Sequence, residues 1–451
     1  MKIIKIQAHN RNFRPRRRAA INALLLTLPL LLLLLSRPLA QAQTFTLLHT
    51  FSGKGDGKYP DEQPLRNNLG TLYGTTDGGG SLGWGTVFEI DAHGKETVLH
   101  NFWGGDGTGF LAASIRDKAG NIYGTASQGG TPEGGGCSHG CGAIFKLDPS
   151  DKLTLLYAFT GGADGGLPVP GLVQDELGNL YGATTIGGDL NCFTEGCGVV
   201  FKLDKNDKET VLYTFTGGAD GMSPNGLIRD EMGNLYGVTA GGPYENGTVF
   251  KLDTAGKKTV LYSFTGGADG SGPNGPLVRD SEGNFYGTAN SGGGPPCDCG
   301  VVFKLDKNGN ETVLHSFQGN PDGYYPYAGL ARDRFGNLYG TTWAGGGEGG
   351  ATCYGLGCGT VFKVEANGNE SVLHAFTGGS DGSLPSSALI VDKSGNLYGV
   401  APEGGDLSCG WRALGCGVVF KLTLPHWISR EGVGCPPHRA PCPVSPLLSR
   451  F

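Results

Sequence analysis

The chain has 451 residues, of which 83 are glycine, and its 35 basic and 41 acidic side chains give a formal net charge of −6. Removal of residues 1–42, which carry eight of the basic side chains and none of the acidic ones, would leave a net charge of −14. A basic surface for nucleic acid is therefore not expected. The high glycine content could indicate low complexity, but regularly spaced aromatic residues argue against a disordered chain.

Residues 1–42 have the layout of an export signal. Arginines within positions 14–18 precede an apolar run at positions 21–35, and positions 40–42 read Ala-Gln-Ala, a small-x-small cleavage pattern. The apolar run spans 15 residues and contains Pro29, whereas a membrane-spanning helix needs about 20. We therefore expect a cleaved signal peptide and a secreted, periplasmic or cell-surface protein. A membrane anchor, if the segment is not cleaved, is the alternative.

Seven copies of one motif follow, each centred on Gly-[Asn/Thr]-[Leu/Ile/Phe]-Tyr-Gly. The motif tyrosines are 50 to 59 residues apart, a spacing typical of propeller blades and solenoid units. Each copy contains four short segments rich in β-branched and aromatic residues, separated by Gly, Asn and Asp turns. No segment after residue 42 shows the period of an amphipathic helix. The motif tyrosines are Tyr73, Tyr123, Tyr181, Tyr236, Tyr286, Tyr339 and Tyr398.

Seven units of four strands predict an all-β fold, a seven-bladed β-propeller over residues 43–422. The first repeat segment, 46–51, has the sequence of a fourth strand, and the last, 418–422, has that of a third strand. We therefore expect the N-terminal strand to complete the last blade and close the ring, which removes free sheet edges. An open β-solenoid is the alternative. Residues 423–451 do not repeat and are rich in proline, so we expect an irregular tail.

Length variation is concentrated in one loop of each copy, between the second and third strands. The motif tyrosine and the third-strand phenylalanine are 14 to 23 residues apart, whereas the third- and fourth-strand phenylalanines are 14 apart. Loops that vary over a fixed scaffold are where binding sites usually lie. We therefore predict ligand contact on the face that carries these loops and the blade connections. The candidate aromatic residues are Trp84, Tyr244, Trp343, Tyr354 and Trp411.

Ten of the twelve cysteines form five pairs within these variable loops. We expect each pair to form a disulfide that staples its loop, which an exported protein can keep oxidised. Zinc sites, which prefer two close pairs, and free thiols are the alternatives, and the single residue between Cys297 and Cys299 counts against that bond. We also expect reduction to loosen the loops more than the ring, because the core aromatic residues should lie elsewhere. The pairs are Cys137/Cys141, Cys192/Cys197, Cys297/Cys299, Cys353/Cys358 and Cys409/Cys416, with Cys435/Cys442 as a further candidate in the tail.

An Asp-Gly dipeptide follows every fourth strand. These carboxylates could bind cations or sugar hydroxyl groups on the loop face, although no calcium-binding Asp-x-Asp-x-Asp loop occurs. We favour a structural role, in which Asp accepts backbone N–H bonds in a tight turn and Gly supplies the positive φ angle. The residues are Asp56, Asp106, Asp164, Asp220, Asp269, Asp322 and Asp381.

Other recurring polar residues also have structural explanations. Asp-x-x-Gly-Asn before the motif tyrosine is a hairpin turn signal. The arginine before this turn, present in five copies, could form an anion-binding ring, but we expect it to pair with neighbouring turn carboxylates.

Histidine and tyrosine alternate at one position of the fourth strand, which indicates a need for a flat ring rather than a catalytic base. No catalytic or phosphate-binding motif appears, and we expect no cofactor and no metal ion.

The unit Asp-x-x-Gly-Asn-Leu-Tyr-Gly, Gly-Thr-Val-Phe-Lys-Leu-Asp and Thr-Val-Leu-Tyr-Ser-Phe-Thr-Gly-Gly-Ala-Asp-Gly resembles the bacterial tandem repeat called GloVer, over residues 46–422. It is also similar, more loosely, to the strand pattern of NHL-type propellers. The GloVer resemblance implies an exported "choice-of-anchor" protein, a kind whose C-termini carry differing surface-anchoring signals. That family has no established activity that could be carried over to this chain. We see no apolar segment with a basic tail and no sorting motif, so the resemblance does not extend to an anchor.

Two classes of function remain. We expect an exported, non-catalytic protein that binds or interacts at a surface through disulfide-stapled loops on one propeller face. Its partner would be an unknown extracellular ligand, for example a glycan or a cell-surface component. The alternative is an extracellular enzyme acting on carbohydrate or another polymer, and an acid–base pair at the mouth of the channel would favour it.

Overall fold

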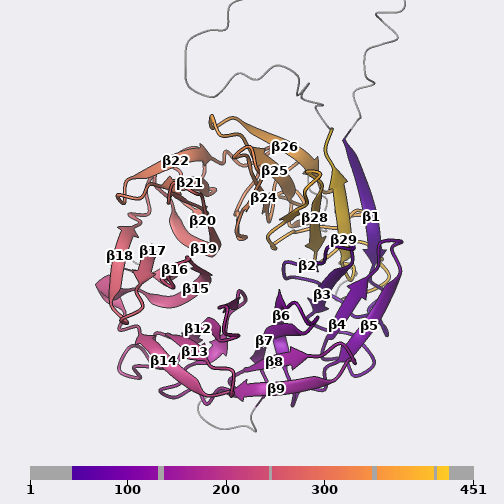
Figure 1. Ribbon diagram of the computed structural model, residues 1–451. Helices are drawn as coiled ribbons and strands as arrows, with labels where there is room; N and C mark the ends of the chain where they lie inside the picture. The colour runs from indigo at the N-terminus through magenta and orange to yellow at the C-terminus, as the bar shows by residue number, and fades with distance from the viewer. Residues whose placement is uncertain (1–42, 131–136, 243–245, 348–352, 411–413, 426–451) are drawn as a thin grey trace, which may run out of the picture. The chain divides into compact units, whose positions relative to one another are not determined.

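The repeated segments form seven antiparallel sheets, arranged as the blades of a β-propeller (Figure 1). The computed structural model describes residues 43–130, 137–242, 246–347, 353–410 and 414–425, and the blades form one unit, Thr44–Thr423. The prediction of an all-β, seven-bladed propeller is confirmed, and the open solenoid is excluded.

The strands of each blade follow one another from the inside of the ring to its outside (Figure 1). In the third blade two short strands, β10 and β11, both pair with β12. A 3-10 turn, Gly218–Asp220, precedes the fourth blade. The first blade contains β2 (Leu65–Arg66), β3 (Leu72–Thr76), β4 (Thr86–Ile90) and β5 (Glu96–Asn101); the second, β6 (Thr108–Arg116), β7 (Ile122–Gln128), β8 (Ala143–Leu147) and β9 (Leu153–Ala158); the third, β10 (Gly166–Pro168), β11 (Val173–Gln174), β12 (Leu180–Ile186), β13 (Val199–Leu203) and β14 (Glu209–Thr214). The fourth contains β15 (Met222–Arg229), β16 (Leu235–Gly241), β17 (Thr248–Leu252) and β18 (Lys258–Ser263); the fifth, β19 (Ser271–Arg279), β20 (Phe285–Ser291), β21 (Val301–Leu305) and β22 (Glu311–Ser316); the sixth, β23 (Ala331–Arg332), β24 (Leu338–Thr342), β25 (Thr360–Val364) and β26 (Glu370–Ala375); the seventh, β27 (Ile390–Val391), β28 (Leu397–Ala401), β29 (Val418–Thr423) and β1 (Thr44–Thr50).

The seventh blade closes the ring. Strand β1 pairs antiparallel with β29, with Thr46 opposite Lys421 and Thr50 opposite Val418. The strand nearest the N-terminus is therefore the outer strand of the last blade, as its sequence predicted. This pairing covers the edge that β29 would otherwise expose.

Pairs of phenylalanines join each blade to the next. The phenylalanine after each fourth strand meets the third-strand phenylalanine of the following blade edge to face, with ring centroids 5.1–5.4 Å apart. Such pairs contribute about 0.5–1.5 kcal/mol each beyond the burial of their area. The repeated aromatic residues therefore form the core between blades. The pairs are Phe51–Phe88, Phe102–Phe145, Phe159–Phe201, Phe215–Phe250, Phe264–Phe303, Phe317–Phe362 and Phe376–Phe420.

Two features explain the motif: a hydrogen-bonded turn, and a close contact between the glycine after the motif tyrosine and the third-strand phenylalanine. In the third blade, the Tyr181 hydroxyl donates to Asp175 Oδ2 at 3.0 Å, and the Asn179 side-chain amide donates to the same oxygen at 2.7 Å. A Cβ atom on Gly182 would lie 2.4 Å from Cζ of Phe201, so only glycine leaves room for the third-strand ring. The structural interpretation of the Asp-x-x-Gly-Asn turn is confirmed.

Five disulfides close the long loops, and all five are the predicted pairs. The bond between Cys297 and Cys299, against which the short spacing counted, is among them. Disulfide formation within each loop is therefore confirmed for the described cysteines. The bonds are Cys137–Cys141, Cys192–Cys197, Cys297–Cys299, Cys353–Cys358 and Cys409–Cys416.

The bonded cysteines are part of the core, which corrects the prediction that they staple loops away from it. Cys141 belongs to the same buried cluster as Ile144 and Phe159, and Cys416 belongs to that of Phe51. The second cysteine of each pair is only four residues before the third-strand phenylalanine, so its side chain enters the same apolar layer. The expectation that the core aromatic residues lie away from the disulfides is therefore wrong. The buried cysteines are Cys141, Cys192, Cys197, Cys299, Cys353, Cys358 and Cys416.

The predicted signal segment, residues 1–42, lies outside the described residues, as do residues 426–451 of the tail with Cys435 and Cys442. Within the part of the chain that the structure describes, there is no helix with the length and apolar character needed to cross a membrane.

Candidate functional site

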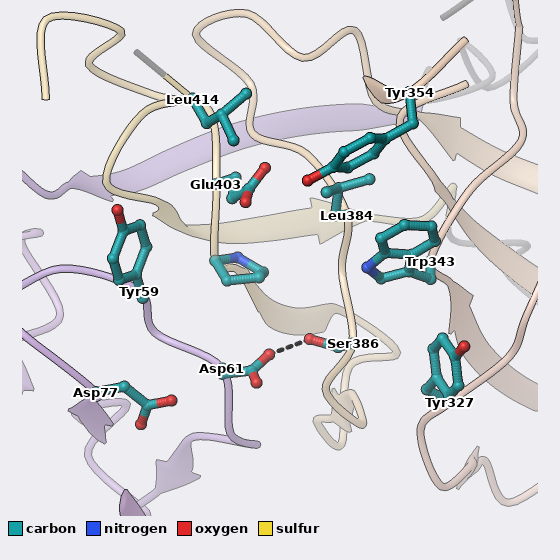
Figure 2. Close-up of a pocket in the computed structure, with 11 residues that line it drawn as sticks. Tyr59, Asp61, Asp77, Tyr327, Trp343, Tyr354, Leu384, Ser386, Glu403 and Leu414 are labelled. Atoms are coloured by element: carbon teal, nitrogen blue, oxygen red, sulfur yellow. Dashed lines mark hydrogen bonds between the residues drawn. The ribbon is translucent and has the colours of Figure 1, made fainter. Parts of the chain in front are cut away.

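A pocket of about 480 Å³, which we call the mouth pocket, opens where the first blade meets the sixth and seventh (Figure 2). Its walls are residues that precede the innermost strands, follow the second strands, or belong to the loops between the second and third strands. It therefore lies on the face of the variable loops. The lining residues are Tyr59, Asp61, Asp77, Tyr327, Trp343, Tyr354, Leu384, Ser386, Pro402, Glu403 and Leu414.

Aromatic rings line two sides of the mouth pocket. Trp343 follows β24 directly and stacks on Tyr354, with centroids 5.8 Å apart and planes 20° apart. Tyr327 meets Trp343 edge to face at 6.5 Å, and Tyr59 stands on the opposite side (Figure 2). Such rings combine broad apolar faces with polar edges, and they are typical of the lining of ligand pockets.

Carboxyl groups lie between and below these rings. Asp61 accepts a hydrogen bond from Ser386 Oγ, which joins the first blade to the seventh (Figure 2). Asp77 Oδ1 accepts one from the Leu111 backbone N–H at 3.0 Å. Glu403 Oε2 is buried and has no hydrogen-bond partner among the described residues. The second oxygens of the partly exposed Asp61 and Asp77 carboxyl groups could accept a hydrogen bond from a hydroxyl or amine of a ligand.

The charges in the mouth pocket are poorly compensated. Burial raises the pKa of Asp61 and of Glu403, and it raises the pKa of Asp77 well above its usual range, with the charge of Asp61 adding to the effect. Their side chains are partly exposed to the pocket, but protein surrounds them on the other sides and limits their hydration. No lysine or arginine is among the described residues that line the pocket, although Lys58 Nζ lies 5.2 Å from the centre of the Tyr59 ring.

A second cavity, of about 380 Å³, adjoins the mouth pocket and is lined by residues from all seven blades, so it belongs to the central channel. Asp61, Tyr327 and Ser386 line both cavities. Glu62 lines the channel and forms no hydrogen bond or ion pair with any described residue. Burial, and then the charges of Asp61 and Asp77, raise the pKa of Glu62 well above its usual range.

The five aromatic residues that we predicted to contact a ligand do not all lie in the mouth pocket. Trp343 and Tyr354 come together in the mouth pocket. Trp84 is 47% exposed and does not line it. Tyr244 and Trp411 lie outside the described residues.

The seven Asp-Gly carboxylates lie at the junctions between blades and line neither cavity. In the connection to the third blade, Asp164 accepts hydrogen bonds from the Thr160 backbone N–H at 2.9 Å and the Tyr157 hydroxyl at 3.0 Å. Gly165 follows with a φ of +93°, and the equivalent Asp106 of the preceding connection is buried. This is the tight turn that we favoured, and direct ligand binding by these carboxylates stays a prediction.

The arginines before the hairpin turns lie against aromatic rings of the turn region. Arg229 lies 5.9 Å from the Tyr181 ring centre of the preceding blade and 3.6 Å from Glu176. Arg66 similarly lies over Tyr398 and 3.8 Å from Asp392. Pairing with turn carboxylates is confirmed for Arg66, Arg229 and Arg279, the last of which lies 3.5 Å from Glu231.

The sequence interpretation missed most of the mouth pocket. Asp61 and Glu62 stand where the second copy has Leu111 and Ala112 and where no other copy has a carboxylate. Asp77 likewise replaces a residue that is Ser127 in the second copy. The missed residues could have been found by aligning the seven copies and searching for departures from the repeat. They are Tyr59, Asp61, Asp77, Tyr327, Ser386 and Glu403 of the mouth pocket, with Glu62 of the adjoining channel.

A family model described as the Gloeobacter/Verrucomicrobia repeat matches the chain twice, over residues 38–192 and 191–413. No sequence among the curated proteins matches the chain.

Two solved structures from B. thetaiotaomicron are similar. One is the extracellular domain of a protein assigned as a hybrid two-component system, with a TM-score of 0.51 and 16% identity, over 84% of this chain and 41% of that chain. The other is the extracellular domain of a protein assigned as a one-component system, with a TM-score of 0.50 and 12% identity, over 85% and 42%. The chain thus spans about two fifths of the length of these proteins. At these identities the likeness concerns the propeller fold alone.

Proposed function

This chain belongs to the Gloeobacter/Verrucomicrobia repeat family, and we propose that it is an exported, non-catalytic protein that binds a saccharide in the mouth pocket. The observation that carries the proposal is the lining of this pocket. Aromatic faces and carboxyl groups converge there, and several of the lining residues, among them Asp61, Asp77 and Trp343, differ from their equivalents in the other copies.

The lining suits a polyhydroxylated ligand. The faces of Trp343, Tyr327 and Tyr59 can cover the apolar C–H face of a sugar ring, while carboxyl oxygens accept hydrogen bonds from its hydroxyl groups. The volume of about 480 Å³ is within the range of small-ligand pockets. Ser386 fixes the orientation of Asp61 before a ligand arrives, which lowers the entropy lost on binding.

Export is supported by two independent features. Residues 1–42 have the layout of a signal peptide. The five disulfides are bonds that persist in oxidising compartments and are rare in reducing ones.

A glycan array with the purified protein tests the binding proposal, followed by calorimetric titration of a glycan that binds. Trp343→Ala should weaken binding at least about tenfold, equivalent to about 1.4 kcal/mol. Trp84→Ala is the matched control, because Trp84 is an exposed loop tryptophan outside the mouth pocket. Loss of binding in Trp84→Ala but not in Trp343→Ala would place the ligand on the loop surface instead, and the absence of any glycan ligand would refute the proposal.

The second candidate is an enzyme acting on carbohydrate, and the observation that favours it is the grouping of Asp61, Glu62 and Asp77. Carboxyl groups whose pKa values are raised in this way can hold a proton for a leaving group, while an ionised neighbour acts as a base or nucleophile. Incubation with the bound glycan distinguishes the two functions. New reducing ends that disappear in Glu62→Gln would favour the enzyme, and an intact glycan would favour binding alone.

A further inference from the structure

The junctions between blades repeat a polar arrangement that the proposed function does not use. At each junction the Asp of Asp-Gly faces an aromatic ring near the end of the preceding fourth strand. Tyr262 OH donates to Asp269 at 3.0 Å, and at the next junction His315 Nε2 lies 3.1 Å from Asp322 Oδ2. Tyrosine fills this position at three junctions and histidine at four.

A glutamate from the outer strand of the following blade joins the Asp at four junctions. In each case one carboxyl oxygen, Oε1, is buried without a hydrogen-bond partner in the described part of the chain. Four independent copies therefore present an unsatisfied acceptor at the same place, next to a second carboxylate. These residues are Glu96, Glu209, Glu311 and Glu370.

The junction after the third blade shows that the glutamate position can hold a cation beside the Asp carboxylate. There the glutamate is replaced by Lys258, whose Nζ lies 2.9 Å from Asp220 Oδ1 with a side chain only 4% exposed. The repeat thus places a positive charge between the blades where the outer-strand residue is a lysine. Where that residue is a glutamate, the same place holds two carboxyl groups without a cation from the described chain.

One junction also has the geometry of a metal site. His315 Nε2 and one carboxylate oxygen each of Asp322 and Glu370 all lie within 4.8 Å of one another, the only such group of three among the described residues. The His315 and Asp322 side chains are 18% and 16% exposed. The backbone N–H of Gln318 donates to both Asp322 oxygens, at 3.0 and 3.1 Å, which holds this carboxylate in position.

We propose that His315, Asp322 and Glu370 bind a divalent transition-metal ion, with Zn²⁺ as the best fit, between the fifth and sixth blades. Zinc takes imidazole nitrogen and carboxylate oxygen at about 2.0–2.2 Å in a tetrahedral arrangement, which places ligand atoms about 3.4 Å apart. The ligand atoms of His315 and Asp322 are already near this separation. Rotation of the Glu370 side chain brings its carboxylate oxygen to the same distance from them. The imidazole ligand favours zinc over calcium or magnesium, which prefer oxygen alone.

The ion would act as a clamp between blades. Two of its ligands, His315 and Asp322, belong to the end of the fifth blade and its connection, and Glu370 begins the outer strand of the sixth. An ion that binds only when these elements are adjacent stabilises the folded ring.

The neighbouring junction supplies a matched control. Tyr262, Asp269 and Glu311 occupy the equivalent positions one blade earlier, with a tyrosine in place of the imidazole. The junction at ring closure contains His49, Asp56 and Glu96, but its ligand atoms do not all lie within 4.8 Å of one another. Tyrosine is also a safe replacement for His315, because the repeat itself uses it at three junctions.

The test is calorimetric titration of the metal-stripped full chain with Zn²⁺, together with the melting temperature with and without the ion. The protein should bind Zn²⁺ and melt at a higher temperature when it is bound. His315→Tyr and Glu370→Gln should each weaken this binding at least about tenfold and remove the rise in melting temperature, while Glu311→Gln should change neither. The proposal is overturned if the unaltered protein binds no zinc, or if binding survives both His315→Tyr and Glu370→Gln. Loss of binding in His49→Tyr alone would also overturn it, because it would place the ion at the closing junction.

Discussion

The glutamates at the blade junctions should lower the stability of the propeller at alkaline pH, and Glu209 allows this to be measured. Glu209 begins β14, and burial, with the charge of Asp164 as a further cause, raises its pKa from 4.5 to about 7. The folded state therefore binds this proton more tightly than the unfolded state does. Stability from this group is present below pH 4.5 and is lost as the pH rises to 7, because above 7 the folded protein must hold a poorly solvated charge.

The size of the effect follows from the two pKa values. Their difference of about 2.5 corresponds to about 3.4 kcal/mol at 1.36 kcal/mol per pH unit. Because the Glu209 side chain is only partly buried, solvent screening reduces this to about 1 kcal/mol. Glu209→Gln removes the charge and keeps the shape, so it should raise the free energy of unfolding by about 1 kcal/mol at pH 8 and change it little at pH 4.5.

Urea unfolding of both proteins at pH 4.5, 6 and 8 measures this difference. Glu195→Gln is the control, since Glu195 is exposed and its substitution should change stability little at any of these pH values. If Glu209→Gln destabilises the protein at pH 8, or stabilises it equally at all three pH values, Glu209 does not carry an uncompensated charge and the reasoning is wrong.

Two further changes test the packing of the ring. Lys258→Met should lower the free energy of unfolding by about 3 kcal/mol in urea titrations, because it leaves the Asp220 carboxylate without its cation between two blades; an unchanged midpoint would show that the pair contributes little. Joint replacement of Cys192 and Cys197 by serine should lower it by about 2–4 kcal/mol and reduce near-ultraviolet circular dichroism, because Cys197 is fully buried in the same cluster as Phe215. A loss confined to protease sensitivity of the loop, without a change in stability, would contradict this packing.

The fold could be predicted because the residues that cause it recur. Phe102 and Phe145 belong to adjacent blades, and the same contact is repeated at every junction, so the period of the aromatic residues is also the period of the architecture. Closure could be predicted as well, since the segment that begins the repeat supplies the strand that β29 lacks.

The mouth pocket could not be predicted in the same way, because its carboxyl groups occur once each and do not recur with the repeat. Asp61 and Ser386 are separated by 325 positions and meet only because the ring closes. Their contact also depends on which side chains point toward the channel, and the strand pattern alone does not determine this in the irregular segments before β2 and β27. Trp343 and Tyr354 were found because they lie on a long loop of the predicted binding face.

The depth of the disulfides was also missed. The loop sequences indicate surface staples, because they are rich in glycine and polar residues. The last residues of each loop nevertheless continue into the third strand, so Cys141, Cys197 and Cys416 are fully buried and Cys358 is only 2% exposed. Spacing from the third-strand phenylalanine was therefore a better guide to burial than the composition of the loop.

A crystal structure of the protein with a glycan found by array tests the central claim most directly. We predict electron density for a sugar ring in the mouth pocket, against Trp343 and within hydrogen-bonding distance of Asp61. Density for the glycan on the opposite face, beside the Asp-x-x-Gly-Asn turns, or on loop tips with the mouth pocket empty, would contradict the account.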